Sequence, residues 1–96
     1  MTTGPMARGH WTRGLPGEPY RHLQPGVRYR VLEAFEDFDG DAHAVGESWI
    51  FLGSNYLPYH GGLSLFISLD GTQEWHIRMQ DEAQAPILEA LERFIG

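Results

Sequence analysis

The chain has 96 residues, of which 42% are hydrophobic and 12% aromatic, and it contains no cysteine. This size favours one domain with a single core, and the lack of cysteine excludes disulfides and thiolate metal sites. Seven arginines against thirteen acidic residues give a formal net charge of −6, which argues against general nucleic-acid binding. The apolar runs are too short to cross a membrane and no secretory signal pattern opens the sequence, so we expect a cytoplasmic protein.

Residues 1–19 differ in composition from the rest of the chain. Glycine and proline interrupt every possible period there, and apolar residues are sparse. Five of the seven arginines lie within the first thirty residues, whereas almost all acidic residues come later. We interpret residues 1–19 as a flexible basic tail and residues 20–96 as the folded domain. Such a charge asymmetry suggests either self-contact or a charged partner.

The domain opens with two predicted strands. Pro25-Gly26 indicates a turn, and apolar and basic residues then alternate over residues 27–31, which is the period of a strand. The alternation blurs after Leu32, as at a bulge or bend. A second strand is expected over residues 43–52, where the run Trp-Ile-Phe-Leu indicates burial on both faces. Residues 53–62 form a long connection rich in aromatic and turn residues.

The clearest local prediction is a β-hairpin in the second half of the chain. Residues 63–69 alternate strictly, Asp70-Gly71 is a strong turn signal, and residues 75–79 alternate again. After it, apolar residues follow a helical spacing over residues 87–95, with Pro86 suited to the first turn. Glu89 and Arg93 are spaced to pair across one turn of that helix. These elements predict a mostly β domain: a small barrel or a strongly bent antiparallel sheet of four or five strands, plus one C-terminal α-helix.

Four motifs carry a family resemblance, and they are Pro25-Gly26-x-x-Tyr29-Arg30-Val31, Phe35-x-Asp37-x-Asp39-Gly40, Gly46-Glu47-x-Trp49-x-Phe51-Leu52-Gly53 and Leu57-Pro58-Tyr59-x-x-Gly62-Leu63-Ser64-Leu65-Phe66. With them, residues 22–78 resemble a small bacterial family known only as a domain of unknown function. That family implies no activity and supplies no catalytic residues. The same spacing is also similar to small SH3-like barrels, although the paired tyrosines of proline-peptide-binding SH3 domains are missing here.

The densest charge feature is an acidic loop, which we define as residues 37–41. Asp37, Asp39, Asp41 and His43 stand at every second position, and on an extended strand they would offer ligands for a hard divalent ion. However, Gly40 interrupts the strand and precedes the third aspartate, unlike the glycine of a calcium loop. A solvated turn is the simpler interpretation. A third possibility is that the loop receives a basic partner or the arginine-bearing tail.

Aromatic residues supply a second candidate surface. A peptide, sugar or base could stack in a groove lined by Trp49, Tyr56, Pro58, Tyr59, Phe66 and Trp75. A chain of this size needs most of its aromatic residues in the core, so we expect Trp49 and Phe51 to be buried there. Tyr56 and Tyr59 lie in the long connection and are expected to be exposed.

No catalytic pattern accompanies these features. His43, His60 and His76 are the plausible general bases of the domain, but no nucleophile elbow, phosphate loop or zinc-protease motif occurs. The sequence therefore favours a non-catalytic module without a cofactor. We expect it to bind a protein partner of unknown identity, a basic protein being one option, and the candidate binding residues are Asp37, Asp39, Asp41, Tyr56, Pro58, Tyr59 and Trp75. The alternatives are an acidic inhibitor or immunity-type protein that neutralises a basic toxin or nuclease, and a metal protein or small enzyme using the Asp/His loop. The oligomeric state stays open.

Overall fold

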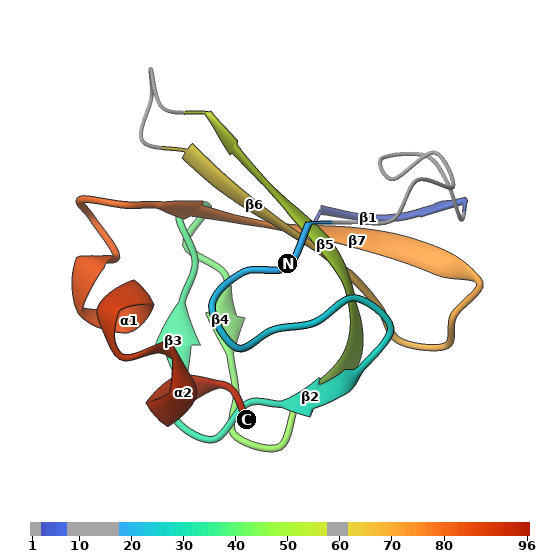
Figure 1. The fold of residues 1–96 in the computed structure, drawn as a ribbon, viewed down its shortest axis with the longest axis horizontal. Helices are drawn as coiled ribbons and strands as arrows, with labels where there is room; N and C mark the ends of the chain where they lie inside the picture. Colours follow the sequence, from blue (N-terminus) through green and yellow to red (C-terminus); the bar gives the residue numbers. More distant parts are fainter. Residues whose placement is uncertain (1–2, 8–17, 58–61) are drawn as a thin grey trace.

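The structure is a computed structural model that describes residues 3–7, 18–57 and 62–96. Its elements, in chain order, are β1 (Thr3–Ala7), β2 (Arg28–Arg30), β3 (Phe35–Glu36), β4 (Ala42–His43), β5 (Ser48–Leu57), β6 (Gly62–Ser68), β7 (Gln73–Gln80), α1 (Ala85–Glu89) and α2 (Leu91–Phe94). Figure 1 shows the two short helices gathered at one end of the sheet. None of the helices in the described part of the chain is long and apolar enough to span a membrane.

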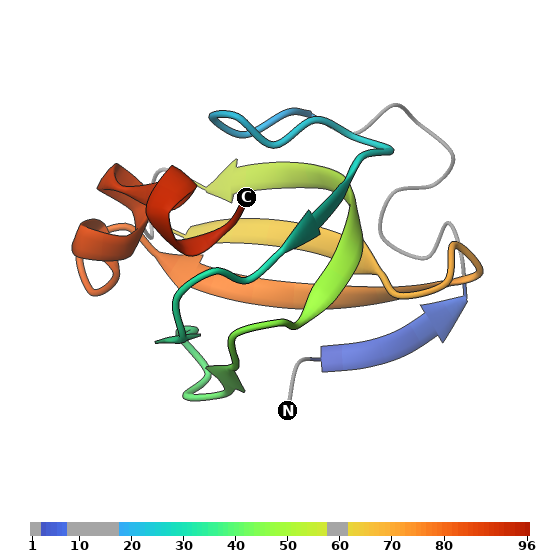
Figure 2. The same ribbon diagram turned by 90° about the horizontal axis from the view of Figure 1, so that it is seen from below.

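Five strands form one antiparallel sheet in the order β1-β7-β6-β5-β2, and β3 and β4 form a separate two-stranded ribbon. The long strand β5 bends strongly across the molecule (Figure 2), and a bulge interrupts its pairing with β6 between Phe51 and Gly53. Because β1 and β2 remain the two edges of the sheet, the barrel does not close. The prediction of a bent, mostly β sheet is confirmed, whereas the closed-barrel alternative is wrong.

The predicted hairpin is confirmed as β6 and β7. Leu65 pairs with Ile77 and Leu63 with Met79, so their side chains share the buried face of the sheet. Trp49 and Phe51 on β5 belong to the same core, and both are fully buried as expected. The core consists of Leu23, Val31, Phe35, Trp49, Phe51, Leu63, Leu65, Ile67, Ile77, Met79, Leu88, Leu91 and Ile95.

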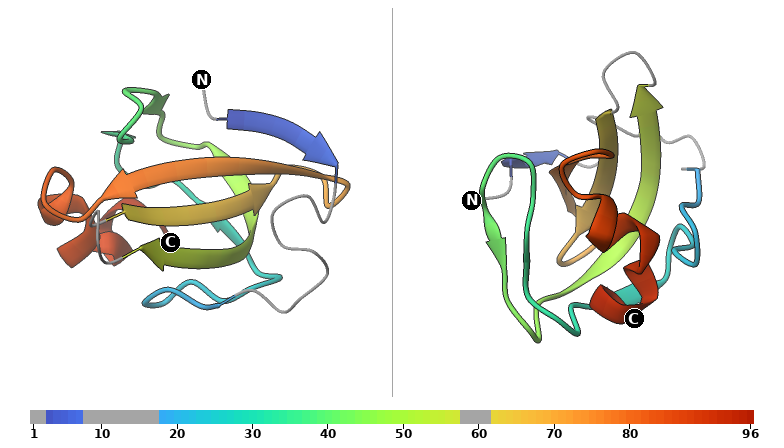
Figure 3. Two further views of the ribbon diagram at one scale, coloured as in Figure 1. Left: turned by 90° about the horizontal axis from the view of Figure 1, so that it is seen from above. Right: turned by 90° about the vertical axis from the view of Figure 1, so that its left-hand side faces the viewer.

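The second predicted strand is divided by a turn. His43 belongs to the short strand β4, and β5 begins only at Ser48. Between them, Gly46 adopts a φ of +95° and Glu47 N–H donates to the carbonyl of Ala44 at 3.0 Å. This turn reverses the chain, so the two-residue strands β3 and β4 form an arm beside the main sheet (Figure 3). A continuous strand over residues 43–52 is therefore wrong.

The N-terminal segment was not predicted to be a strand. Residues 3–7 pair with β7 as β1, which corrects the tail interpretation for this segment, while residues 8–17 lie outside the described part. A Cβ at Gly4 would lie 2.7 Å from the carbonyl oxygen of Glu74 and 2.9 Å from the Trp75 ring. Gly4 is thus required for the close approach of β1 to β7. From the sequence Gly4 resembles a loop residue, because the strand with which it pairs, β7, lies far along the chain.

The C-terminal helical pattern is realised as two short helices that break at Ala90. Leu88, Leu91 and Ile95 are buried as the apolar period predicts. The predicted pairing of Glu89 with Arg93 is replaced by another, since Arg93 Nε lies 2.9 Å from Glu33 Oε2. After α2 the chain becomes extended, and Gly96 exchanges two backbone hydrogen bonds with Arg30, which covers the edge of β2.

Candidate functional site

The acidic loop is built around one buried carboxylate, that of Asp37. Its Oδ1 accepts the backbone N–H groups of Asp39 and Asp41, each at 3.0 Å, and the residue is 3% exposed. Gly40 completes the turn with a φ of +83°. Because the loop is closed by its own aspartate, residues 37–41 form a compact turn between β3 and β4.

A buried histidine fixes the other oxygen of Asp37. His43 Nε2 lies 2.8 Å from Asp37 Oδ2, and its Nδ1 lies 2.7 Å from Glu47 Oε2. The same Glu47 oxygen accepts the indole N–H of Trp49 at 3.0 Å. Both ring nitrogens of His43 thus face carboxylates, as an imidazolium requires. Burial alone lowers the pKa of His43, but the hydrogen bonds and charges of Glu47 and Asp37 outweigh it and raise the pKa above 6.5.

These contacts test whether the four residues of the proposed metal site could bind one ion together. Asp37 and His43 come together, but they bind each other and the loop backbone, while Asp39 pairs with Arg78. Among the residues that the structure describes, no group of three histidine, aspartate or glutamate side chains could hold a metal ion. The four residues therefore do not converge on a common ligand position. The alternate spacing reflects an ion-pair network that holds a turn.

A hollow lies between this loop and the C-terminal half of β7. We call it the β7 hollow; its volume is about 400 Å³, and it is lined by Phe38, Gly62, Leu63, Ser64, His76, Arg78, Met79 and Gln80. Phe38 is 48% exposed, and its backbone N–H donates to the carbonyl of Arg78 at 2.8 Å. The loop is thereby attached to the edge of β7, with an apolar ring at the rim of the hollow.

Polar groups converge on the same hollow. Arg78 Nη1 lies 3.2 Å from Asp39 Oδ1, and the guanidinium carbon lies 5.7 Å from the centre of the Phe38 ring. Ser64 Oγ and His76 Nε2 form a hydrogen bond of 2.7 Å. Burial, and next the positive charge of Arg78, lower the pKa of His76 below 6.5, so its imidazole is neutral at neutral pH. A largely apolar hollow with a few convergent polar groups is the usual form of a binding site.

Comparison with known protein families matches residues 18–94 to the family described as Domain of unknown function (DUF3601). The chain belongs to this family. The resemblance seen in the sequence motifs is thereby confirmed. Among solved structures, the DUF3601 domain is similar to an integron cassette protein from the mobile metagenome of Vibrio cholerae, with a TM-score of 0.79 and 31% sequence identity over 88% of this chain and 94% of that chain. A search of curated proteins found no match.

The structure of the DUF3601 domain describes only some of the residues of the predicted aromatic groove. Tyr56 is 47% exposed, as expected, and its hydroxyl donates to Asp81 Oδ2 at 2.6 Å. Trp49 is fully buried in the core and offers no stacking surface, while Trp75 is partly buried against the core from β7. Pro58 and Tyr59 lie outside the described residues. The structure therefore joins the acidic loop to the β7 hollow, while the lining of that hollow does not include Tyr56.

The residues that line the hollow were largely missed by sequence analysis. Ser64, His76 and Arg78 sit on the polar side of the hairpin alternation, which reads as an ordinary solvent-facing side. One signal was available: Phe38 is a large apolar residue between two aspartates in a turn, where burial was not expected. Because Ser64 is the cross-strand partner of Arg78, the hairpin register alone places their side chains together.

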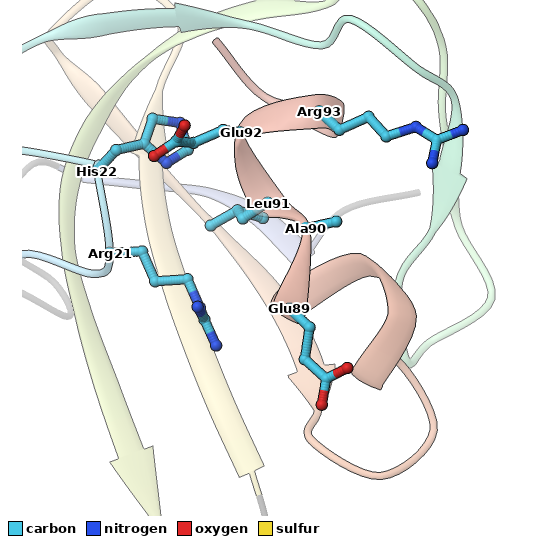
Figure 4. A pocket seen from close by; sticks show the side chains of 7 residues that line it. All are labelled: Arg21, His22, Glu89, Ala90, Leu91, Glu92 and Arg93. Atoms are coloured by element: carbon cyan, nitrogen blue, oxygen red, sulfur yellow. The ribbon is translucent and has the colours of Figure 1, made fainter.

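A second hollow of about 300 Å³ lies at the break between α1 and α2, and it is lined by Arg21, His22, Glu89, Ala90, Leu91, Glu92 and Arg93. Figure 4 shows Arg21 reaching in from one side and Glu89 from the other, while Arg93 points away. His22 Nε2 donates to the carbonyl of Ile95 at 2.6 Å, which ties the segment before β2 to the C-terminus. Most of its charged side chains are solvent-exposed, and we assign this hollow no role in the DUF3601 domain.

Proposed function

We propose that the protein is a non-catalytic interaction module of the cytoplasm, which binds a protein partner through the acidic loop and the β7 hollow. The observation that carries the proposal is the exposed Phe38 ring at the rim of a hollow of about 400 Å³. Large aromatic side chains beside partly apolar hollows are typical anchor points of protein interfaces.

The hydrogen bonds that hold the acidic loop in place support this proposal. Phe38 follows Asp37, whose carboxylate is fixed by two backbone N–H groups and by His43. A side chain on a loop held in this way loses little conformational freedom when it binds, so more of the contact energy remains as affinity.

A selection of peptides from a random display library tests the proposal. Peptides selected on the wild-type protein should bind Phe38→Ala at least about tenfold more weakly, as for an interface anchor. Leu69→Ala is the matched control, because Leu69 is 47% exposed but lies at the turn after β6 and does not line the hollow. Peptides that bind Phe38→Ala as well as wild type, or a selection that yields no binder, would refute the proposed face.

A second candidate function is an acidic inhibitor of a basic protein. Glu82, Glu89 and Glu92 are exposed around the helical end of the sheet, in a chain with a net charge of −6. Such a surface speeds association with a basic partner at low salt. Association rates measured with a basic protein such as a nuclease should fall steeply with ionic strength, and a flat response rejects this candidate.

A further inference from the structure

One guanidinium, that of the protein's own Arg78, lines the β7 hollow. This group is bounded on one side by the Asp39 carboxylate, at 3.2 Å, and on another by the Phe38 ring, at 5.7 Å from the guanidinium carbon to the ring centre. A carboxylate and an aromatic face are the two surfaces that a planar guanidinium recognises best. The contact of Arg78 with Asp39 and Phe38 therefore indicates that this loop can bind a guanidinium group.

The contact between Arg78 and Asp39 is weak enough for another guanidinium to replace Arg78. The side chains of Arg78 and Asp39 are 52% and 31% exposed, and ion pairs of that exposure hold weakly. The loop does not depend on it, because Asp37, His43 and the hydrogen bond from Phe38 N–H to the Arg78 carbonyl hold its backbone. The Arg78 side chain can thus leave while the surfaces of Phe38 and Asp39 stay in position.

We propose that the acidic loop is a binding site for an arginine side chain of a basic protein segment, and that Arg78 occupies this site as an internal competitor in the unbound protein. The proposal rests on the proposed function and names the side chain that the partner inserts. The incoming guanidinium replaces that of Arg78 on Asp39 and Phe38, and its alkyl stem lies in the β7 hollow beside the Phe38 ring.

Charge and shape select arginine over other side chains. Asp39 and Asp41 place carboxylates on this loop, so an anionic segment is repelled. Lysine offers a point charge that is strongly hydrated and does not stack as a plane on an aromatic ring. An apolar side chain fits the hollow but leaves the Asp39 carboxylate without a new partner. We therefore expect arginine to bind more tightly than lysine, and lysine more tightly than an uncharged analogue.

NMR titration with three capped amino acids tests the inference. The probes are the N-acetyl methylamides of arginine, lysine and norleucine, and the signals to follow are the backbone amides of Phe38, Asp39, Ser64 and Arg78. Arginine should bind most tightly. Asp39→Asn and Phe38→Leu should weaken its binding about threefold or more, as expected when one favourable surface contact is lost.

The decisive variant is Arg78→Met, which keeps an unbranched apolar stem but removes the internal competitor. It should bind the arginine probe roughly threefold to tenfold more tightly than wild type. Arg93→Met is the matched control, because Arg93 pairs with Glu33 and does not line the β7 hollow, and it should leave binding unchanged. The His43 imidazole signals report in each variant whether the acidic loop is still held.

Two results would overturn the inference. Weaker or unchanged arginine binding by Arg78→Met, with the His43 signals intact, would show that Arg78 is not a competitor. Equal binding of arginine and norleucine would show that the hollow takes apolar groups without regard to charge. In either case, peptides that bind in a Phe38-dependent manner would leave the proposed function standing, whereas the absence of such peptides would remove both.

Discussion

Replacement of His43 by leucine is the sharpest test of how the acidic loop is held. The side chains of His43 and Asp37 are each 1% exposed, so the substitution leaves the Asp37 carboxylate buried without its cationic partner. Removal of one member of a buried ion pair costs about 3–5 kcal/mol. Asp37 keeps two backbone N–H donors and Glu47 keeps the Trp49 indole, so we expect a loss near the lower end, about 3 kcal/mol.

Equilibrium unfolding in urea measures this loss, with the m value as a check that the unfolding transition keeps its character. The double variant Asp37→Asn/His43→Leu provides the matched comparison. Asparagine retains the oxygen that accepts the loop N–H groups but carries no charge, so in the leucine background it should restore part of the lost stability. A loss below about 1 kcal/mol for His43→Leu, or a further loss on adding Asp37→Asn, would refute the ion-pair reasoning.

Further predictions concern pH and three other contacts. Because the pKa of His43 is raised in the folded state, its stabilisation is complete below pH 6.5 and is lost as the pH rises through the folded value. The difference in unfolding free energy between wild type and His43→Leu should therefore shrink as the pH rises above 6.5, and a constant difference contradicts the assignment. His76, whose folded pKa is lowered, acts in the opposite direction, which is why this difference is the quantity to measure. The hydrogen bond to Asp81 raises the phenol pKa of Tyr56, so Asp81→Asn should move the ultraviolet titration of that phenol back toward 10.0, and Tyr56→Phe identifies its contribution; no change in Asp81→Asn argues against the contact. Gly4→Ala should loosen β1 from β7, seen as faster amide exchange in β1 with the β6–β7 pairing unaffected, because its Cβ would meet the Glu74 carbonyl at 2.7 Å. Leu65→Ala, at a fully buried core position on β6, should lower the free energy of unfolding by about 2–5 kcal/mol, and a loss under 1 kcal/mol would mean that the core collapses around the site.

Local patterns predicted the elements whose partners lie close in sequence. The β6–β7 hairpin is correct because alternation over both strands and the Asp70-Gly71 turn act within a few residues, and Asp70 Oδ1 does accept the N–H groups of Thr72 and Gln73. The helical period likewise marked Leu88, Leu91 and Ile95 as buried, although the break at Ala90 was not signalled.

Contacts between distant segments decided what the local patterns left open. The strand β1 exists through its pairing with β7, and nothing within residues 3–7 announces that partner. The alternating Asp37 and His43 were visible as a possible ligand pair, but only the turn before β5 brings Glu47 to the second ring nitrogen and makes the pair a buried ion network. The hollow is lined jointly by Phe38, Ser64 and Arg78 only because the arm of β3 and β4 contacts the edge of β7.

The sequence by itself determined the class of the protein: one small, mostly β domain of a family of unknown function, with an acidic loop and a C-terminal helical segment. Tertiary structure alone decided that the sheet stays open, that His43 is buried between two carboxylates, and that the loop frames a hollow. The physical reason is the separation along the chain over which each kind of interaction acts. Periodicity and turn chemistry act over a few residues, whereas burial and charge pairing depend on which surfaces the folded chain brings into contact.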